Sequence, residues 1–326
     1  MRGRLLACGV LLLAIGAGAE EPPKAAPIPP SLGWAYPRGL EKEPYPAPAA
    51  DTVYRVKGSA LSFTGAELEK LPDAVDWLPA EHPANPPDVV LHGDQSKKRE
   101  ACASCHGHAG QGFLEIPSLA GLPAGYIAEQ LHEFQAGRRA SADPDREVAS
   151  YMAEIAKVLS EKEIQEAAAY FASLGKRSLP VRVVEADQAP AVRDDYHGWM
   201  DIVPNGGTQP TGRRVVLVAE DFMQQWVNDP HSGNIAYVPT GAVARGKALA
   251  HRGRQACVSC HGPDLKGLGA APALAGRDPH YLARQLWDIK SGARKGPTVA
   301  LMQKPAAGVA PDEIVDLVAY IASLKP

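Results

Sequence analysis

Two short stretches hold the side chains with the most distinctive chemistry. Cys102 and His106 bound the first, Cys-Ala-Ser-Cys-His, while Cys257 and His261 bound the second, Cys-Val-Ser-Cys-His. Two thiols separated by two residues can add across the two vinyl groups of one haem, and the histidine that follows is then placed to bind the iron. Each stretch therefore predicts a covalent c-type haem, with these attachment and iron-binding residues: Cys102, Cys105 and His106; Cys257, Cys260 and His261.

The flanking sequence decides against the other uses of this motif. A single Cys-x-x-Cys pair also marks zinc sites and dithiol redox sites, but the halves of a four-cysteine zinc site lie roughly 15–20 residues apart. Here the motifs begin 155 residues apart, and Pro117-Ser-Leu-Ala-Gly121 returns at that offset as Pro272-Ala-Leu-Ala-Gly276. Tyr126 and Tyr281 are paired in the same way. An internal duplication of about 80 residues per copy favours two haem sites.

The sixth ligand of each iron decides between electron transfer and catalysis. Met152 and Met302 lie at matching places in the two copies, each expected in the loop just before the last helix of its copy. One methionine alone is more often core filling, but two at equivalent places favour binding of iron through sulfur. Histidine is the competing ligand, yet only His106 and His261 have a counterpart at the offset of 155. A histidine and methionine pair would close both irons.

The pattern within the copies is helical. In the first copy, residues 89–178, apolar side chains follow helical spacing from Tyr126 to Phe134, and a capping box, Ser160-Glu-Lys-Glu163, begins a further helix. The second copy, residues 240–326, repeats this pattern and begins its last helix at Pro311-Asp-Glu. The predicted fold is therefore mainly α, with two haem domains in tandem.

These motifs together resemble class I cytochromes c, and the duplication is similar to the dihaem cytochrome c4 group. The resemblance covers 89–178 and 240–326. It implies three main helices around each haem, with the first and last crossing, and carbonyl groups of Pro117 and Pro272 that accept the N–H of the two histidines. It also implies that Tyr126 and Tyr281 line the haem pockets, although core packing explains them equally. Arginines after the middle helices could meet haem propionates or remain solvated surface charges: Arg138, Arg139 and Arg294.

The remaining segments depart from that family. Residues 1–19 combine two arginines, an apolar run and Ala-Gly-Ala, which predicts a cleaved secretory signal and a periplasmic protein with no membrane-spanning segment afterwards. Residues 20–88 form a proline-rich, irregular extension, expected to pack on the first haem domain after residue 50. The linker, 179–239, holds two β-branched runs separated by Asn205-Gly-Gly, which predicts a small two-stranded element.

The net charge of the chain and the predicted iron ligands limit which functions are compatible with the sequence. After cleavage 32 basic and 37 acidic residues remain, so the net charge is −5. A mild acidic excess argues against nucleic acid or an anionic membrane as partner. Two closed haems predict a periplasmic electron carrier, or the electron-transfer subunit of a dehydrogenase or oxidase system, acting between redox partner proteins. The alternatives are a dihaem peroxidase or thiosulfate-oxidising cytochrome, which needs an open or labile sixth position, and a docking module with structural haems.

Overall fold

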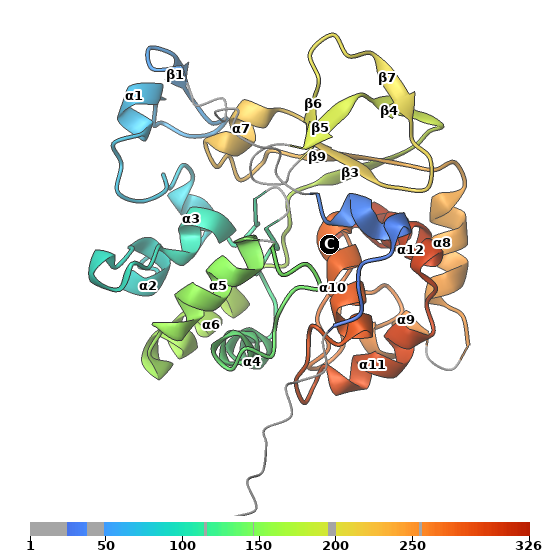
Figure 1. The fold of residues 1–326 in the computed structure, drawn as a ribbon. Helices are drawn as coiled ribbons and strands as arrows, with labels where there is room; N and C mark the ends of the chain where they lie inside the picture. Colours follow the sequence, from blue (N-terminus) through green and yellow to red (C-terminus); the bar gives the residue numbers. More distant parts are fainter. Residues whose placement is uncertain (1–24, 38–48, 114–115, 146, 195–199, 254–255) are drawn as a thin grey trace, which may run out of the picture.

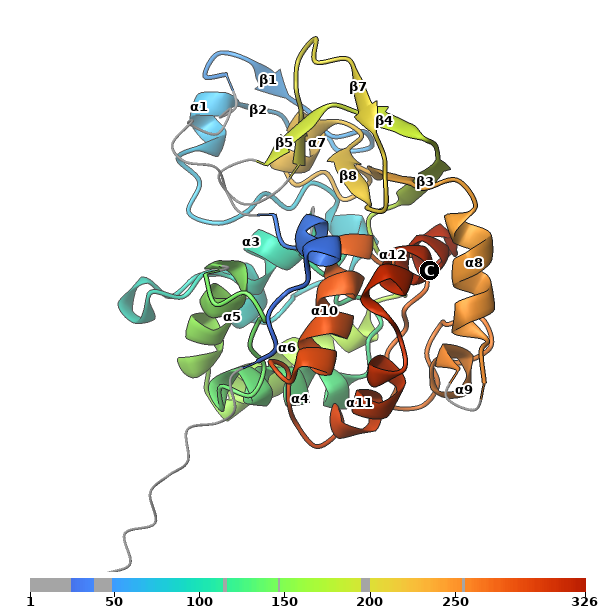
Figure 2. The ribbon, with the colours of Figure 1, turned by 45° about the vertical axis from the view of Figure 1, so that its right-hand side comes forward.

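Two helical lobes lie side by side, and a mixed module of short strands and helices covers one end of both (Figures 1 and 2). The computed structural model describes residues 25–37, 49–113, 116–145, 147–194, 200–253 and 256–326. The predicted signal segment, 1–19, lies outside the described residues. Two tandem helical domains, expected from the duplicated sequence, are present.

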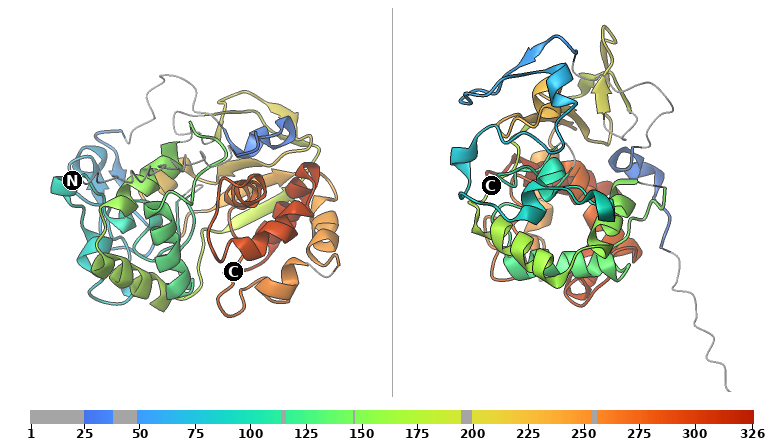
Figure 3. Two further views of the ribbon diagram at one scale, coloured as in Figure 1. Left: turned by 60° about the horizontal axis from the view of Figure 1, so that its bottom comes forward. Right: turned by 90° about the vertical axis from the view of Figure 1, so that its left-hand side faces the viewer.

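The first lobe contains the first haem motif. The short α2 (Asp88–Leu91) and the 3-10 helix η3 (Gln95–Lys97) precede α3 (Cys102–His106). Three longer helices follow: α4 (Ala124–Gln135), α5 (Glu147–Lys157) and α6 (Glu161–Ser173). Ile127, Ile164 and Phe171 form part of the core between α4 and α6. Figure 3 shows these helices arranged as a ring when the lobe is viewed from its side. The resemblance implied a main first helix, but α2 is a single turn.

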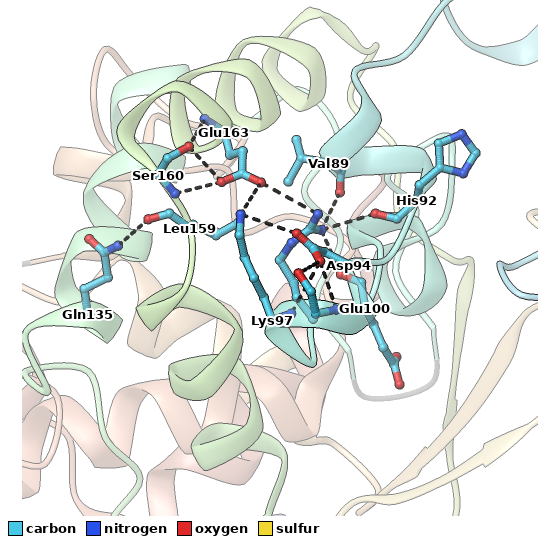
Figure 4. Close-up of polar contacts among 11 residues, drawn as sticks. Val89, His92, Asp94, Lys97, Glu100, Gln135, Leu159, Ser160 and Glu163 are labelled. Carbon is cyan, nitrogen blue, oxygen red and sulfur yellow. Dashed lines mark hydrogen bonds and ion pairs between the residues drawn. The ribbon is translucent and has the colours of Figure 1, made fainter.

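The start of α6 holds the chain that leads into the haem motif (Figure 4). The predicted capping box is present, because the Glu163 backbone N–H donates to Ser160 Oγ and the Ser160 N–H donates to Glu163 Oε2, at 3.3 and 2.8 Å. Glu163 Oε1 also lies 3.5 Å from Lys97 Nζ and 3.7 Å from Arg99 Nη2. The buried Arg99 in turn donates to the carbonyl of Val89. One glutamate therefore caps a helix and anchors the segment before Cys102.

The second lobe repeats this arrangement and adds a full first helix. Its helices are α8 (Ala242–Ala250), α9 (Cys257–His261), α10 (Pro279–Ser291), α11 (Ala300–Ala307) and α12 (Pro311–Ser323). Helix α8 packs closely on α12, since a Cβ at Gly246 would collide with the carbonyl oxygen of Asp316 and with Tyr320. Arg213 and Arg245 both pair with the buried Asp316 carboxylate, at 3.1 and 2.9 Å. The implied crossing of first and last helices is therefore seen in this lobe.

The linker is larger than the two-stranded element that its sequence predicted. It contains β3 (Val181–Glu185), β4 (Gln188–Pro190), β5 (Val192–Asp194), β6 (Met200–Ile202), β7 (Thr208–Pro210), β8 (Val216–Ala219), α7 (Phe222–Trp226) and β9 (Asn234–Val238). The two β-branched runs do not pair with each other. Both flank β9, with β3 parallel and β8 antiparallel to it. Strand β9 alternates buried and half-buried residues and joins the two runs in a three-stranded sheet, whereas the two-stranded sheets of the linker are β4 with β7 and β5 with β6.

The extension packs on the linker as well as on the first haem domain. Its short elements are the 3-10 helices η1 (Pro30–Ala35) and η2 (Pro79–Glu81), β1 (Val53–Tyr54), β2 (Phe63–Thr64) and α1 (Gly65–Leu68). Tyr54, Val56 and Trp77 share a buried cluster with Val227 at the end of α7. The extension also contacts the first haem domain: the His82 ring stacks on His108, the Gly93 N–H donates to Asp73 at 3.0 Å, and Arg177 pairs with Glu81 at 2.6 Å. The extension therefore lies against both the first lobe and α7.

The arm around η1 crosses the second lobe and packs on α10. Leu32, Trp34 and Tyr36 are buried there, and the Trp34 and His280 rings lie 5.3 Å apart. The Tyr36 hydroxyl donates to Asp288 Oδ1 at 2.9 Å, and the Ala142 backbone N–H of the first lobe donates to the same oxygen at 2.8 Å. Asp288 thus joins the arm, α10 and a loop of the first lobe.

We expect Asp288 to make stability depend on pH. Burial raises the pKa of this carboxyl from its ordinary 3.8 to about 6. A pKa raised by folding stabilises the folded state below the unfolded pKa, and this contribution is lost as pH rises through about 6. The free energy of unfolding of the wild type should therefore fall by roughly 2 kcal/mol, relative to Asp288→Asn, between pH 4 and pH 7.

Denaturant unfolding of both proteins at the two pH values measures this change. The asparagine variant is the control, because every other titrating group is common to both proteins. An equal difference in stability at both pH values would contradict the assignment.

Among the described residues, no helix combines the length and the apolar character needed to cross a membrane.

Candidate haem sites

Each haem motif is a single turn of helix that ends at its histidine. In α3, Cys102 and Cys105 are three residues apart and so lie on neighbouring positions of one face. Neither cysteine forms a disulfide in the structure. In α9, Cys257 is half-buried and Cys260 is exposed. The four cysteines that the sequence assigned to haem attachment are therefore not joined in disulfides and lie in two equivalent turns.

The two histidines are held in the orientation that an iron ligand needs. His106 Nδ1 lies 2.9 Å from the Pro117 carbonyl oxygen, and His261 Nδ1 lies 2.8 Å from that of Pro272. Nδ1–H donates to the carbonyl, which leaves the Nε2 lone pair for a metal. Burial lowers the pKa of His106 to about 4 and also lowers that of His261. Both imidazoles are therefore neutral and fixed, as the resemblance implied for these contacts.

A tight loop brings each carbonyl to its histidine. Gly112 has a φ of 82° and its equivalent Gly267 a φ of 87°. A Cβ at either position would press on the backbone just before or after the proline, since the nearest atoms are the Ile116 oxygen and the Ala271 oxygen. Glycine allows both the left-handed conformation and this close approach. The duplication thus preserves the loop as well as the ligand.

Both methionines lie in helices, which corrects their expected place in loops. Met152 lies within α5 and Met302 within α11, and both are half-buried. Residues 147–157 contain neither glycine nor proline, so they continue as a helix. Met302 packs against Ile289, Val299 and Ala306. Binding of iron by these two sulfurs stays a prediction.

The two lobes meet through a reciprocal set of contacts. Arg294 Nη2 donates to the Tyr126 hydroxyl and Arg139 Nη2 donates to the Tyr281 hydroxyl, each at 3.2 Å. Arg139 and Arg294 also form an isolated antiparallel bridge, flanked by the Lys295 N–H donating to the Arg138 carbonyl at 2.7 Å. Because both pairs are related by the offset of 155, the interface has approximate two-fold symmetry. Tyr126 and Tyr281 therefore belong to the boundary between the sites.

This boundary concentrates positive charge. Arg277 and Arg294 are 9% and 5% exposed, and Arg139 is half-buried beside them. Burial, and then the charge of Arg294, lower the pKa of Arg139. Among the described residues, no carboxylate pairs directly with these three guanidinium groups. Arg294 Nε and Gln130 Nε2 are buried without a hydrogen-bond partner there. Buried cations with unused donors fit the propionate carboxylates of two haems, whose attachment turns lie on either side.

Sequence reasoning missed part of this boundary. Gln130 and Gln285 accept hydrogen bonds from Arg294, each at 2.7 Å, and Arg277 Nη1 donates to the Ser118 carbonyl of the other lobe. The two glutamines repeat at the offset of 155, which was the available signal. Arg138 is outside the set, because it is exposed and pairs with Glu133 at 2.7 Å.

The chain is similar in sequence to known c-type cytochromes. The cytochrome c family model matches residues 92–175 and 243–325, just over half of the chain. The thiosulfate dehydrogenase electron acceptor of Thiomonas intermedia (strain K12) is 28% identical, over 72% of this chain and 78% of that protein. Cytochrome c4 of Pseudomonas aeruginosa is 27% identical, over 70% and 85% respectively. A solved thiosulfate dehydrogenase (TsdBA) from Marichromatium purpuratum aligns with a TM-score of 0.49 at 27% identity, over 73% of this chain and 39% of that one.

The family match covers both turns that carry Cys-x-x-Cys-His, and both keep their histidine against the carbonyl of the following loop. This chain belongs to the cytochrome c family, as a c-type cytochrome with two covalently bound haems.

Proposed function

We propose that this chain carries single electrons between redox partner proteins and that neither iron is a catalytic centre. The observation that carries the proposal is the equivalence of the two sites. Each site has the same attachment turn and the same histidine contact. Each also has a methionine in the helix that precedes the last helix of its lobe, within α5 in the first lobe and within α11 in the second. A catalytic dihaem protein needs an iron with an open, labile or unusual sixth position. Two alike sites, each with a methionine proposed as sixth ligand, suit transfer of electrons instead.

The boundary between the lobes supports a path between the sites. Arginine and tyrosine side chains from both lobes hydrogen-bond to each other there; Arg294 is buried, and Arg139, Tyr126 and Tyr281 are half-buried. Such groups would hold the propionate edges of two haems toward each other and exclude water between them. A haem supplies a reversible one-electron couple; the protein supplies orientation and a rigid, charged surrounding. Electrons that enter at one lobe could then leave at the other.

The relatives suggest the class of donor. One is named an electron acceptor of thiosulfate dehydrogenase, and another a cytochrome c4. We extend the first name to a proposal that the donor is a dehydrogenase that oxidises a small sulfur compound. The apolar segment at 5–15 and the Ala-Gly-Ala at 17–19 support export to the periplasm, where such a donor would be met.

The proposal is tested by asking whether small molecules reach either iron. The reduced protein should not bind carbon monoxide, and it should turn over neither peroxide nor thiosulfate. It should still pass electrons to an added redox protein. Steady-state turnover of either compound at about 1–1000 per second would reject the carrier and establish an enzyme.

A further inference from the structure

The loops that follow the two haem histidines differ in burial. Residues 107–112 of the first loop are all buried, whereas most of residues 263–270 in the second are exposed. The extension contributes to this cover, because side chains between 75 and 82 line one small cavity together with Gly107, His108 and Gln111. The second domain has the exposed Pro263 at the position equivalent to His108. The environment of the first haem loop is therefore specific to this half of the chain.

A buried histidine of the extension faces this loop. The His82 side chain is only 4% exposed, and its ring stacks on that of His108 with the centroids 6.0 Å apart. Its Nε2 lies 2.9 Å from Asp76 Oδ2, and its Nδ1 lies 3.1 Å from the Pro83 carbonyl oxygen. An ionised carboxylate and a carbonyl can only accept hydrogen bonds, so both contacts are made when both ring nitrogens carry a proton. The geometry is therefore that of a cationic imidazole paired with a carboxylate.

Two other carboxylates of this segment have partners of their own. Glu81, which also lines the cavity, contacts Arg177 and His231 at 2.6 and 2.8 Å. Asp73 lies 2.9 Å from His92. Neither carboxylate therefore needs the cavity histidine as its cation.

The remaining described groups around the cavity carry no charge. Burial lowers the pKa of His108, so this ring is neutral. Burial raises the pKa of Tyr170 in α6 to about 12, so its hydroxyl keeps its proton. The linker contributes the uncharged Asn228 and Pro230. Gain or loss of one proton at His82 is therefore the charge change expected at this cavity near neutral pH.

A row of ring contacts leads from His82 to the first iron ligand. The ring centroids of His82 and Tyr170 lie 6.4 Å apart, those of Tyr170 and Phe171 5.2 Å, and those of Phe171 and His106 6.5 Å. Tyr170 and Phe171 are both buried. Charges that interact through a buried, apolar region are screened much less than charges in water. A charge at His82 should therefore act on the haem that His106 binds.

The second domain offers an exposed counterpart. Tyr320 occupies in α12 the place of Tyr170 in α6, three residues before the end of the helix, and the ring of His251 lies 6.3 Å from it. His251 is exposed, and its Nδ1 lies 2.8 Å from the Lys247 carbonyl oxygen. Solvent screens a charge at such a position. His251 therefore resembles His82 in its neighbour but not in its burial.

We propose that His82 couples proton uptake to reduction of the first haem. When one electron reaches the iron, the positive charge of the haem falls by one, and the affinity of His82 for a proton rises. The proton comes from solvent and binds to an imidazole nitrogen, and no other bond changes. Conversely, loss of this proton leaves the Asp76 carboxylate without its cation, which favours the oxidised haem. The proposal needs the covalent haem but not the carrier function.

Redox titrations of the full-length mature protein between pH 5 and pH 8, followed by optical spectroscopy, test this coupling. One of the two one-electron potentials should fall as pH rises across this range, in which imidazoles titrate. A roughly threefold rise in the proton affinity of His82 on reduction corresponds to a fall of about 30 mV, because a tenfold change is 59 mV for a one-electron couple.

Two variants should change this potential at opposite ends of the pH range. His82→Gln leaves the carboxylate unpaired at every pH, so the potential should lie below that of the wild type at pH 5 and match it at pH 8. Asp76→Asn removes the negative charge, so the potential should lie above that of the wild type at pH 8. Loss of packing alone would not give these opposite signs. The control, His251→Gln, should leave both potentials near those of the wild type at each pH.

The outcomes that overturn the proposal are distinct. They are a wild type in which neither potential depends on pH, a pH dependence that His82→Gln retains, and an equal effect of His251→Gln. A potential of Asp76→Asn at or below that of the wild type at pH 8 also overturns it. Covalent haem content is measured on the same samples. If His82→Gln does not retain both haems, the sign of the Asp76→Asn shift at pH 8 decides.

Discussion

Replacing Met302 with alanine is expected to open the second iron while its haem stays attached. The thioether bonds at Cys257 and Cys260 do not depend on the sixth ligand, so colour should remain with the denatured polypeptide. The reduced variant should bind carbon monoxide at one haem of the two, and the reduction potential of that haem should fall, because a thioether ligand favours the reduced state. Optical spectra of the reduced protein with and without carbon monoxide measure the first effect, and a redox titration measures the second.

Met223→Ala is the matched control. Met223 is half-buried in α7, outside both haem domains, so its loss should leave both irons closed. Met152→Ala should reproduce the Met302 result at the first haem. An unchanged spectrum in Met302→Ala would mean that another residue holds the second iron.

Replacing Arg294 with methionine is expected to cost about 1–3 kcal/mol of unfolding free energy, because it removes the donor to three acceptors at the boundary between the lobes. Arg294 contacts Tyr126, Gln130 and Gln285, and the side chain is only 5% exposed. Loss of a positive charge near the haems also favours the oxidised state, so both reduction potentials should fall. Denaturant unfolding and a redox titration of the variant measure these effects.

Arg182→Met is the control for this second prediction. Arg182 is exposed and pairs with the exposed Glu220 at 3.0 Å, so its loss should cost at most about 1 kcal/mol. It should also leave both potentials near those of the wild type. Equal losses in the two variants would show that the interface arginine has no special role.

The local parts of the fold were predictable because they depend on residues near one another in the chain. The haem turns, the start of α6 at Ser160 and the loop from His106 to Pro117 each need only about a dozen residues, and their duplication doubled the signal. The position of the charged boundary was partly visible, since Arg139 and Arg294 share the offset of 155. Their mutual contact depends on how two lobes dock, which no local pattern contains.

The remaining parts depend on distant contacts. Strand β3 pairs with β9 more than 50 residues later in sequence, although β8 looked like the nearer partner. The arm at Trp34 and Tyr36 packs on α10, some 250 residues later in the sequence. There the Tyr36 hydroxyl donates to the buried carboxylate of Asp288. Residues 147–157 form a helix because no glycine or proline interrupts one, although the sequence favoured a loop around Met152. Tyr45, the third aromatic residue of the arm, lies outside the described residues.

The central claim is that one chain holds two covalent haems whose irons are both closed. An anaerobic redox titration of the full-length mature protein, followed by optical spectroscopy, tests it most directly. The account predicts that each chain takes up two electrons, in one-electron steps, with a low-spin spectrum at every stage and a sulfur-to-iron absorption band for both oxidised haems. Uptake of a single electron, or a high-spin component in the oxidised or reduced protein, would contradict it.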